Sequence, residues 1–140
     1  MLIEIEELRS ALYEYQADQI AEDNDTTIRK QILAAEELIR SYLVNRYDVS
    51  AIWDAVGDDR NPLLLEHIKS IAVWYLLRLS NPDVLFEKAE KYYQMTMEWL
   101  DKVADGLLNP TLPPIDADGD GRPDDVTGWG CSEKRNDNSY

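Results

Sequence analysis

The chain has 140 residues, of which 44% are hydrophobic and 30% are charged, and its formal net charge is −14. This length and composition are typical of one globular domain and exclude a disordered chain. The negative charge repels phosphate backbones and therefore excludes ordinary nucleic-acid binding. The longest apolar run, Ile71–Leu77, is too short to cross a membrane, and the acidic first residues lack the pattern of a secretion signal. We therefore expect a protein that stays in the cytoplasm of the cell that makes it.

Half of the net charge lies in the first 25 residues, where eight acidic residues accompany one base, Arg9. The simplest interpretation is a solvated acidic face that keeps the protein soluble. A second interpretation is that DNA passes close to this surface and must not bind to it. A third is an acidic mimic of DNA that inhibits a nucleic-acid enzyme. The charge alone does not choose among them.

Apolar residues recur at helical spacing in the first half of the chain. Residues 5–15 predict a short helix. A longer helix is predicted to begin after Asp25 or Thr26, both good N-cap residues, and to end near Tyr47. Charges occupy the side of this helix opposite its apolar stripe, which consists of Ile28, Ile32, Ala35, Ile39, Tyr42 and Leu43.

The second half repeats one start signal. Residues 50–56 predict one or two helical turns that carry Ile52 and Trp53 inward, and a break follows at Gly57. Asn61-Pro62 and Asn81-Pro82 each predict the start of a helix, because asparagine caps and proline is tolerated in the first turn. The two helices are predicted to end near Leu79 and Asp105, with Gly106 as a C-cap. The predicted inner side of the last helix consists of Leu85, Ala89, Tyr92, Tyr93, Thr96, Leu100, Val103 and Ala104.

These elements predict an all-α fold, a small antiparallel bundle of four to five helices over residues 1–107, with a long irregular C-terminal arm over residues 108–140. The segment Ile71–Leu77 is apolar on every side and must be buried. A domain of this size can rarely surround one helix completely, so this segment favours an oligomer. Six aromatic residues fall mainly on the predicted helices, and most of them are expected in the core; they are Trp53, Trp74, Tyr75, Tyr92, Tyr93 and Trp99.

The sequence contains no pattern typical of an enzyme site. His67 is the single histidine and lies on an apolar helix, which favours a structural role over a metal site or a proton relay. Cys131 is the single cysteine and lies in a polar segment without a nearby histidine. A phosphate-binding loop and a nucleophile elbow are also missing. We therefore expect a protein without catalytic activity or a resident cofactor, apart from the calcium considered next.

The strongest local motif is an aspartate-rich loop at residues 116–125. Asp116, Asp118, Asp120 and Asp124 occupy four of the ligand positions of a calcium loop, and Gly121 falls where such loops turn sharply. Thr127 stands where a bidentate glutamate would close the coordination shell. The loop therefore predicts either a weak calcium site, which would suit a small calcium-binding regulatory or adaptor module, or an acidic turn without metal.

The end of the arm carries residue types that are enriched in protein interfaces. Trp129 lies between two glycines, and a basic pair, Lys134 and Arg135, precedes the terminal Tyr140. Aromatic residues and arginine commonly anchor interfaces. We predict that these four residues bind a partner, and the alternative is a terminus without fixed structure.

Several stretches, taken in order, carry a family resemblance. They are Ile5-Glu6-Glu7-Leu8, residues 34–43 with Arg46-Tyr47-Asp48, residues 61–66, residues 71–76, and Tyr92-Tyr93 with Glu98-Trp99-Leu100 and Gly106. With this order and spacing, residues 1–113 resemble the small head–tail connector (adaptor) proteins of tailed phages, particularly the Mu-like prophage family.

The resemblance implies a helical virion protein without catalytic residues. Such subunits form a homo-oligomeric ring, here expected to be dodecameric, beneath the portal, and they bridge the portal to downstream tail proteins, often by an extended arm. In this chain the arm is residues 108–140. DNA would pass through the ring without specific binding, which suits the acidic surface. The expected location is the head–tail interface of the virion, reached from the host cytoplasm during assembly.

Overall fold

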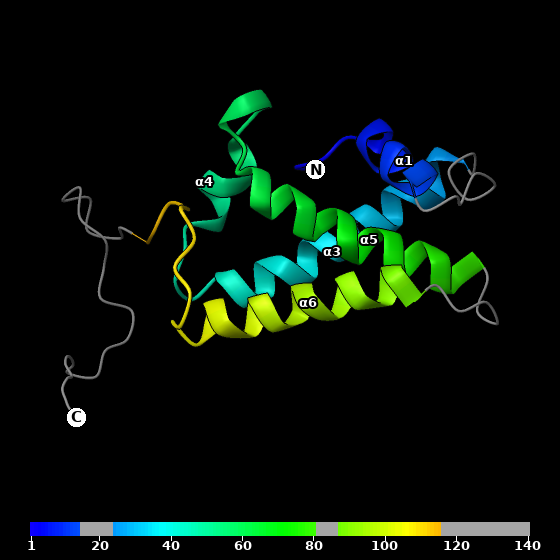
Figure 1. The fold of residues 1–140 in the computed structure, drawn as a ribbon. Coiled ribbons are helices and arrows are strands. Elements are labelled where there is room, and N and C mark those ends of the chain that lie inside the picture. The colour runs from blue at the N-terminus through cyan, green and yellow to red at the C-terminus, as the bar shows by residue number, and fades with distance from the viewer. Residues whose placement is uncertain (15–23, 81–86, 116–140) are drawn as a thin grey trace.

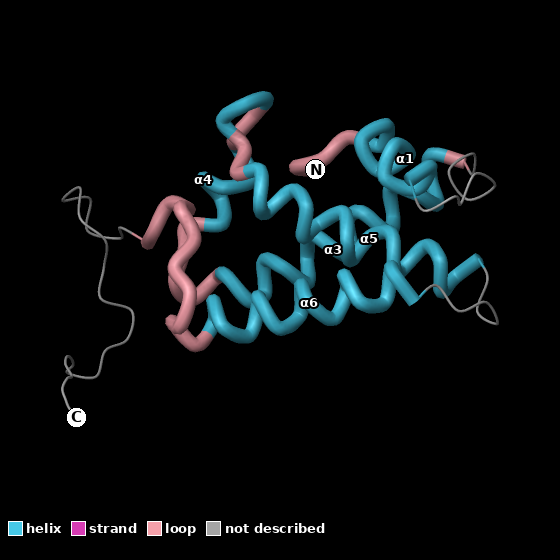
Figure 2. The backbone as a smooth tube through the Cα atoms, viewed as in Figure 1, coloured by secondary structure: helices cyan, strands magenta, loops and turns pink. Residues whose placement is uncertain are grey.

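The computed structural model describes residues 1–14, 24–80 and 87–115, and in these ranges every regular element is a helix (Figures 1 and 2). The predicted all-α fold is therefore confirmed. The elements in chain order are α1 (Ile5–Glu14), α3 (Asp25–Leu43), α4 (Val49–Asp54), the 3-10 turn η1 (Gly57–Asp59), α5 (Pro62–Ser80) and α6 (Glu87–Ala104). None of these helices is long and apolar enough to cross a membrane. The Asn81-Pro82 signal and Leu85 lie outside the described residues.

Helix α3 differs from its prediction at both ends. Its N-cap is Asn24, whose Oδ1 accepts a hydrogen bond from the Thr27 amide at 3.0 Å, so Asp25 and Thr26 lie inside the helix. The helix ends at Leu43, four residues earlier than predicted, and a turn follows. The predicted apolar stripe is buried, except that Tyr42 is only half-buried. The periodicity therefore gave the face of the helix correctly and its ends incorrectly.

Side-chain caps set the next two helix starts. Asp48 Oδ1 accepts from the Ala51 amide at 3.1 Å at the start of α4. Asn61 Oδ1 accepts from the Leu64 amide at 3.0 Å, and Pro62 is the first residue of α5, as predicted. These side chains satisfy backbone N–H groups that have no partner inside the helix.

Helix α6 ends in a Schellman motif. Gly106 adopts φ +81°, its amide donates to the Val103 carbonyl at 3.1 Å, and the Leu107 amide donates to the Lys102 carbonyl at 2.8 Å. This is the predicted glycine C-cap. The predicted inner side of α6 is wrong at Tyr92 and Ala104, which are exposed, because the buried positions follow a narrower stripe. That stripe consists of Ala89, Thr96, Leu100 and Val103.

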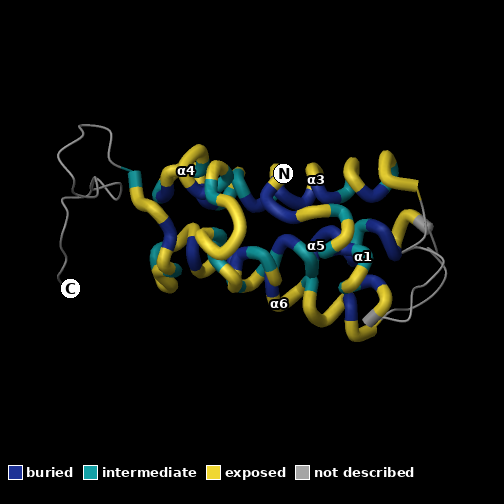
Figure 3. The backbone as a smooth tube through the Cα atoms, turned by 90° about the horizontal axis from the view of Figure 1, so that it is seen from above, coloured by how far each residue is buried: buried dark blue, intermediate teal, exposed yellow. Residues whose placement is uncertain are grey.

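Helices α3 and α5 form the centre of the bundle and pack on each other, and each also contacts α1 and α6. Viewed from above, α3 runs along one long side of the molecule, and α1 and α6 lie along the other (Figure 3). Five residues of the predicted apolar segment of α5 are buried in the single chain, namely Ile71, Ala72, Val73, Leu76 and Leu77, while Trp74 and Tyr75 are half-buried. The chain thus surrounds most of this segment by itself, and the segment does not support the oligomer that we inferred from it.

The six aromatic residues that were considered for the core do not lie inside it. Trp53, Trp74, Tyr75, Tyr93 and Trp99 are partly buried and pack against the core from outside, and Tyr92 is exposed. The core itself is aliphatic, apart from Tyr47 at its edge, and its largest fully buried side chains are leucines and isoleucines. The expectation that most of these aromatics are core residues is therefore wrong, because the aliphatic residues alone fill the space between the helices.

Candidate partner-binding surfaces

The predicted site residues of the arm lie outside the described residues. These are the tentative calcium ligands Asp116, Asp118, Asp120 and Asp124 and the predicted partner-binding residues Trp129, Lys134, Arg135 and Tyr140. Both predictions therefore stay predictions. In the part of the chain that the structure describes, no three His, Cys, Asp or Glu side chains lie close enough together to hold a metal ion.

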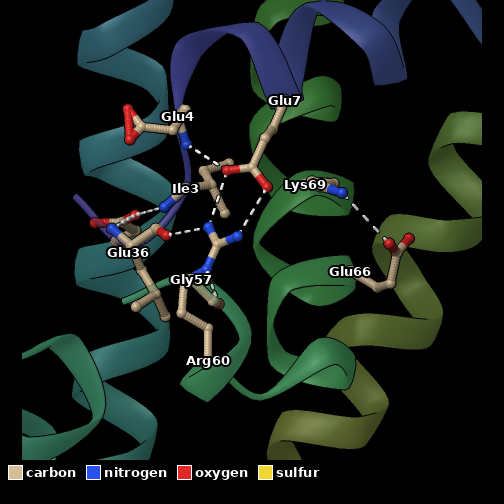
Figure 4. A network of polar contacts seen from close by, with 9 residues as sticks. Ile3, Glu4, Glu7, Glu36, Gly57, Arg60, Glu66 and Lys69 are labelled. Atoms are coloured by element: carbon tan, nitrogen blue, oxygen red, sulfur yellow. Dashed lines mark hydrogen bonds and ion pairs between the residues drawn. The ribbon is translucent and has the colours of Figure 1, made fainter. Parts of the chain in front are cut away.

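A network of polar contacts fixes the chain around η1 (Figure 4). Arg60 Nη1 and Nη2 donate to the two carboxylate oxygens of Glu7 at 2.9 and 3.3 Å, and Nη1 also donates to the Leu2 carbonyl at 2.9 Å. Arg60 Nε donates to the Gly57 carbonyl at 2.8 Å. The Arg60 hydrogen bond holds the pKa of the Glu7 carboxyl below its ordinary value, and that carboxylate in turn raises the pKa of Arg60. One guanidinium thereby joins the N-terminal segment, α1 and η1.

Glu36 is the second centre of this network, and the sequence analysis missed it. Glu36 is only 3% exposed, although charged residues were predicted on the opposite side of this helix from its apolar stripe. Glu36 Oε2 accepts from the Leu2 and Ile3 amides at 2.7 and 3.3 Å, and Oε1 accepts from Trp53 Nε1 at 3.1 Å. The carboxylate thus satisfies two backbone amides that belong to no helix, and it ties α4 to α3. These donors replace the water that a buried carboxylate loses.

The first residues of the predicted arm are anchored to the body. The Asp48 amide donates to the Pro113 carbonyl at 2.8 Å, and Tyr47 forms an antiparallel bridge with Pro114. Asn61 Nδ2 donates to the Thr111 carbonyl at 3.0 Å. Leu112 is buried against the core. Residues 108–115 therefore pack on the bundle, and the predicted boundary at residue 107 does not mark where packing on the body ends.

Arg46 also stabilises this junction between the arm and the body. Its Nη1 donates to the Val103 carbonyl at 3.0 Å, and its Nη2 donates to Asn109 Oδ1 at 3.0 Å. The guanidinium approaches Gly106 so closely that a Cβ at this glycine would lie 2.7 Å from Arg46 Nη1. Arg46 thus holds the end of α6 and the start of the arm in one arrangement.

A groove runs between α5 and α6. It encloses a cavity of about 340 Å³ whose lining includes His67, Ser70, Lys88, Tyr92, Met95 and Thr96. Tyr92 and Met95 are among the exposed large hydrophobic residues. Lys91 and Glu87 line an adjoining hollow on the first turns of α6, which shares Lys88, Tyr92 and Met95 with the groove. The groove therefore offers an apolar wall with lysines beside it.

His67 forms part of this groove in the structural role that its sequence position suggested. Its ring stacks on Trp99 with the centroids 4.1 Å apart, and Nδ1 lies 2.7 Å from Thr96 Oγ1. Nε2 is buried and has no hydrogen-bond partner among the described residues. Burial lowers the pKa of His67 to about 4, so the ring is neutral at pH 7.

The family comparison agrees with this helical fold. Residues 3–122 match the model of the family described as Bacteriophage Mu, Gp36, which spans the bundle, the anchored start of the arm and part of the aspartate-rich loop. Neither the curated proteins nor the solved structures contain a match. Because the match covers most of its length, the chain belongs to the bacteriophage Mu Gp36 family.

Proposed function

We propose that this chain is a virion structural protein that forms a ring connecting the portal of the head to the tail of a tailed bacteriophage. The observation that carries the proposal is the match of residues 3–122 to a bacteriophage family. A role in phage structure or assembly fits this membership, and the ring and its position at the head–tail interface are our proposal. Such a role needs binding surfaces, and we propose that the protein has no catalytic residues; the calcium site at the aspartate-rich loop stays a separate prediction.

Two features of the molecule support the proposal. The described residues form a helical bundle, and the whole chain is strongly acidic, with a formal net charge of −14. A channel wall with this charge would let DNA pass without specific binding. The proposed assembly is a homo-oligomeric, dodecameric ring that contacts the portal on one side and downstream tail or ring proteins on the other.

The arm supplies the proposed docking element. Its first residues are held on the body by Asp48, Asn61 and the Arg46 contacts, so the remaining arm leaves from a fixed point. We propose that residues 116–140 reach a neighbouring ring or the portal and bind through Trp129, Lys134, Arg135 and Tyr140. A fixed starting point lowers the conformational freedom that the arm loses on binding.

The direct test is genetic and uses the phage that encodes the chain. A deletion of the gene should yield DNA-filled heads and complete tails that remain separate, as seen by electron microscopy of lysates, and the intact gene supplied in trans should restore joined particles. Joined, infectious particles without the protein would overturn the proposal. A defect confined to capsid assembly or to DNA packaging would also overturn it.

A truncation separates the ring from the arm. A chain that ends at Ile115 keeps every contact between the arm and the body that the structure describes. We expect this variant to be folded but unable to join heads to tails. The matched control replaces Trp129, Lys134, Arg135 and Tyr140 by alanine in the full-length chain, and it should reproduce most of the defect. Full activity of the truncated chain would exclude the arm as the docking element.

A further inference from the structure

A short protrusion between α4 and α5 carries an exposed apolar residue among acids. We call residues 54–59 the knob. Val56 is 73% exposed, more than any other large hydrophobic residue that the structure describes. Asp54, Asp58 and Asp59 are exposed around it. An exposed valine alone is ordinary, but a projecting turn that carries an exposed valine and three exposed aspartates is a defined chemical surface.

The knob is held in a fixed shape. Gly57 adopts φ +58°, and its carbonyl accepts from both Arg60 Nε and the Arg60 amide, at 2.8 and 3.3 Å. Arg60 is fixed in turn by Glu7 and by the Leu2 carbonyl (Figure 4). Because this network already orders the turn, the knob itself loses little conformational entropy when a partner binds it.

The groove between α5 and α6 has the complementary chemistry. Tyr92 and Met95, the latter 52% exposed, provide an apolar wall. Its cavity of about 340 Å³ exceeds the roughly 150 Å³ that accommodates a molecule the size of benzene, so it can hold a valine side chain. Lys88 and Lys91 provide positive charge at the rim, beside Glu87. Glu66, the other acid of the groove, already pairs with Lys69 at 3.5 Å.

We propose that the knob of one copy of this chain inserts into the α5/α6 groove of a second copy, with Val56 against Tyr92 and Met95 and the knob aspartates beside Lys88 and Lys91. This inference names the contact between copies in the ring and in that respect rests on the proposed function. The positive charge of the rim lysines and the negative charge of the knob aspartates are complementary, which favours a second copy as the occupant. An acidic, apolar-tipped turn fits this rim, and the same chain carries that turn.

The positions of the two surfaces determine the kind of assembly. The knob projects from the α4 end on one edge of the molecule, as the short green segment between α4 and α5, and α6 runs along the opposite edge (Figure 1). Because the knob and the groove are two different patches, a single contact between them cannot form a two-fold dimer. They make a head-to-tail contact that repeats from copy to copy and closes into a ring when the rotation permits.

Disulfide trapping tests the contact directly. All variants carry Cys131→Ser in the full-length chain. We expect Val56→Cys copies mixed with Met95→Cys copies to form covalent dimers under mild oxidation, and the Val56→Cys/Met95→Cys double variant to form a ladder of higher species. Val44→Cys paired with Met95→Cys is the matched control, because Val44 is 49% exposed and is not part of the knob. Trapping is measured by non-reducing electrophoresis, on concentrated protein and on particles assembled in cells. Trapping no greater than in the control, in both settings, would overturn the inference.

Charge reversal provides a second readout that a folding defect cannot imitate. Asp58→Lys/Asp59→Lys should slow the trapping of Val56→Cys on Met95→Cys copies by about tenfold, as should Lys88→Asp/Lys91→Asp. Combining the two reversed surfaces should restore most of the rate. A combination as slow as the single reversals would overturn the inference. If the gene proves unnecessary for joining heads to tails while the trapping occurs, the proposed function fails and this contact stands. If the gene is required for joining but no trapping above the control occurs, the proposed function stands and this contact fails.

Discussion

The centre of the bundle and its α4 end are held together by different interactions. At the centre, α3 and α5 pack through aliphatic residues that are completely buried, such as Ile32, Ile39 and Leu76. At the α4 end, chain segments are joined by hydrogen bonds between backbone groups and side chains: Glu36 accepts from the Leu2 amide, whereas Arg60 and Arg46 donate to carbonyls. Apolar packing tolerates many sequences, whereas these bonds require particular side chains at particular places. The part of the molecule that presents the knob and the arm is therefore the part with the more specific chemistry.

The largest expected effect comes from a cavity at the bundle centre. Leu76→Ala removes a fully buried side chain from α5 and should lower the free energy of unfolding by about 3–4 kcal/mol. Urea denaturation followed by tryptophan fluorescence measures this loss. Leu79→Ala, on the same helix at a residue 59% exposed, should change the free energy of unfolding by less than about 0.5 kcal/mol. Equal losses in the two variants would mean that α5 is not packed as described.

The next effect tests the α4 end. Glu36→Ala leaves the Leu2 and Ile3 amides and Trp53 Nε1 without their acceptor, and it should cost about 2–3 kcal/mol in the free energy of unfolding. Glu37→Ala is the matched control, because Glu37 is exposed on the same helix and should have almost no effect. The amides of Leu2 and Ile3 should also lose their protection in hydrogen exchange in the Glu36 variant alone. Protection that survives this substitution would contradict the tethering role of Glu36.

These two regions also differ in how far the sequence determined them in advance. The apolar stripe of α3 was predictable because side chains repeat on one face every three or four residues. Glu36 lies four residues after Ile32 and three before Ile39, so the same periodicity placed it on the buried face. Its charge nevertheless predicted an exposed side chain, because burying an isolated carboxylate is costly. The hydrogen-bond donors that offset this cost come from segments whose positions the periodicity does not predict.

The surfaces were less predictable than the core. The groove depends on how far Tyr92 and Met95 lie from the buried stripe of α6, and a shift of one position along a helix moves a side chain by about 100°. The knob depends on Arg60, whose partners Glu7 and Leu2 are more than fifty residues away in the chain. Gly106, by contrast, was predictable because a C-cap is a local feature.

A pH-dependent effect of intermediate size should come from His67. In the unfolded chain a histidine titrates near pH 6.5, whereas burial lowers the pKa of His67 in the folded chain to about 4. Between these values the unfolded state binds more protons, so the free energy of unfolding should fall as the pH drops from 6.5 to 4, by about 2 kcal/mol in total after a reduction for the solvent screening of the partly exposed ring.

Because His67 is the only histidine, its ring protons give an unambiguous signal in a ¹H NMR titration. The expected midpoint is near pH 4. In denaturation experiments, His67→Gln should remove the dependence of the free energy of unfolding on pH between pH 6.5 and 5, where carboxylates contribute least. A midpoint near 6.5 would show that the ring is not buried against Trp99.

The smallest expected effect compares two glycines that both adopt positive φ, one in the knob and one at the start of the arm. Gly57→Ala meets no atom within 4 Å, so its cost should be the backbone strain alone, about 1 kcal/mol. Gly106→Ala has similar strain and also places its Cβ 2.7 Å from Arg46 Nη1, which should add about 1 kcal/mol. Arg46→Ala should abolish this extra cost when the two substitutions are combined, since the added methyl group then has no guanidinium to displace. Equal losses of unfolding free energy at the two glycines, with Arg46 intact, would mean that Arg46 does not hold the end of α6 against the arm, and the fixed starting point that we propose for the arm would lose its physical basis.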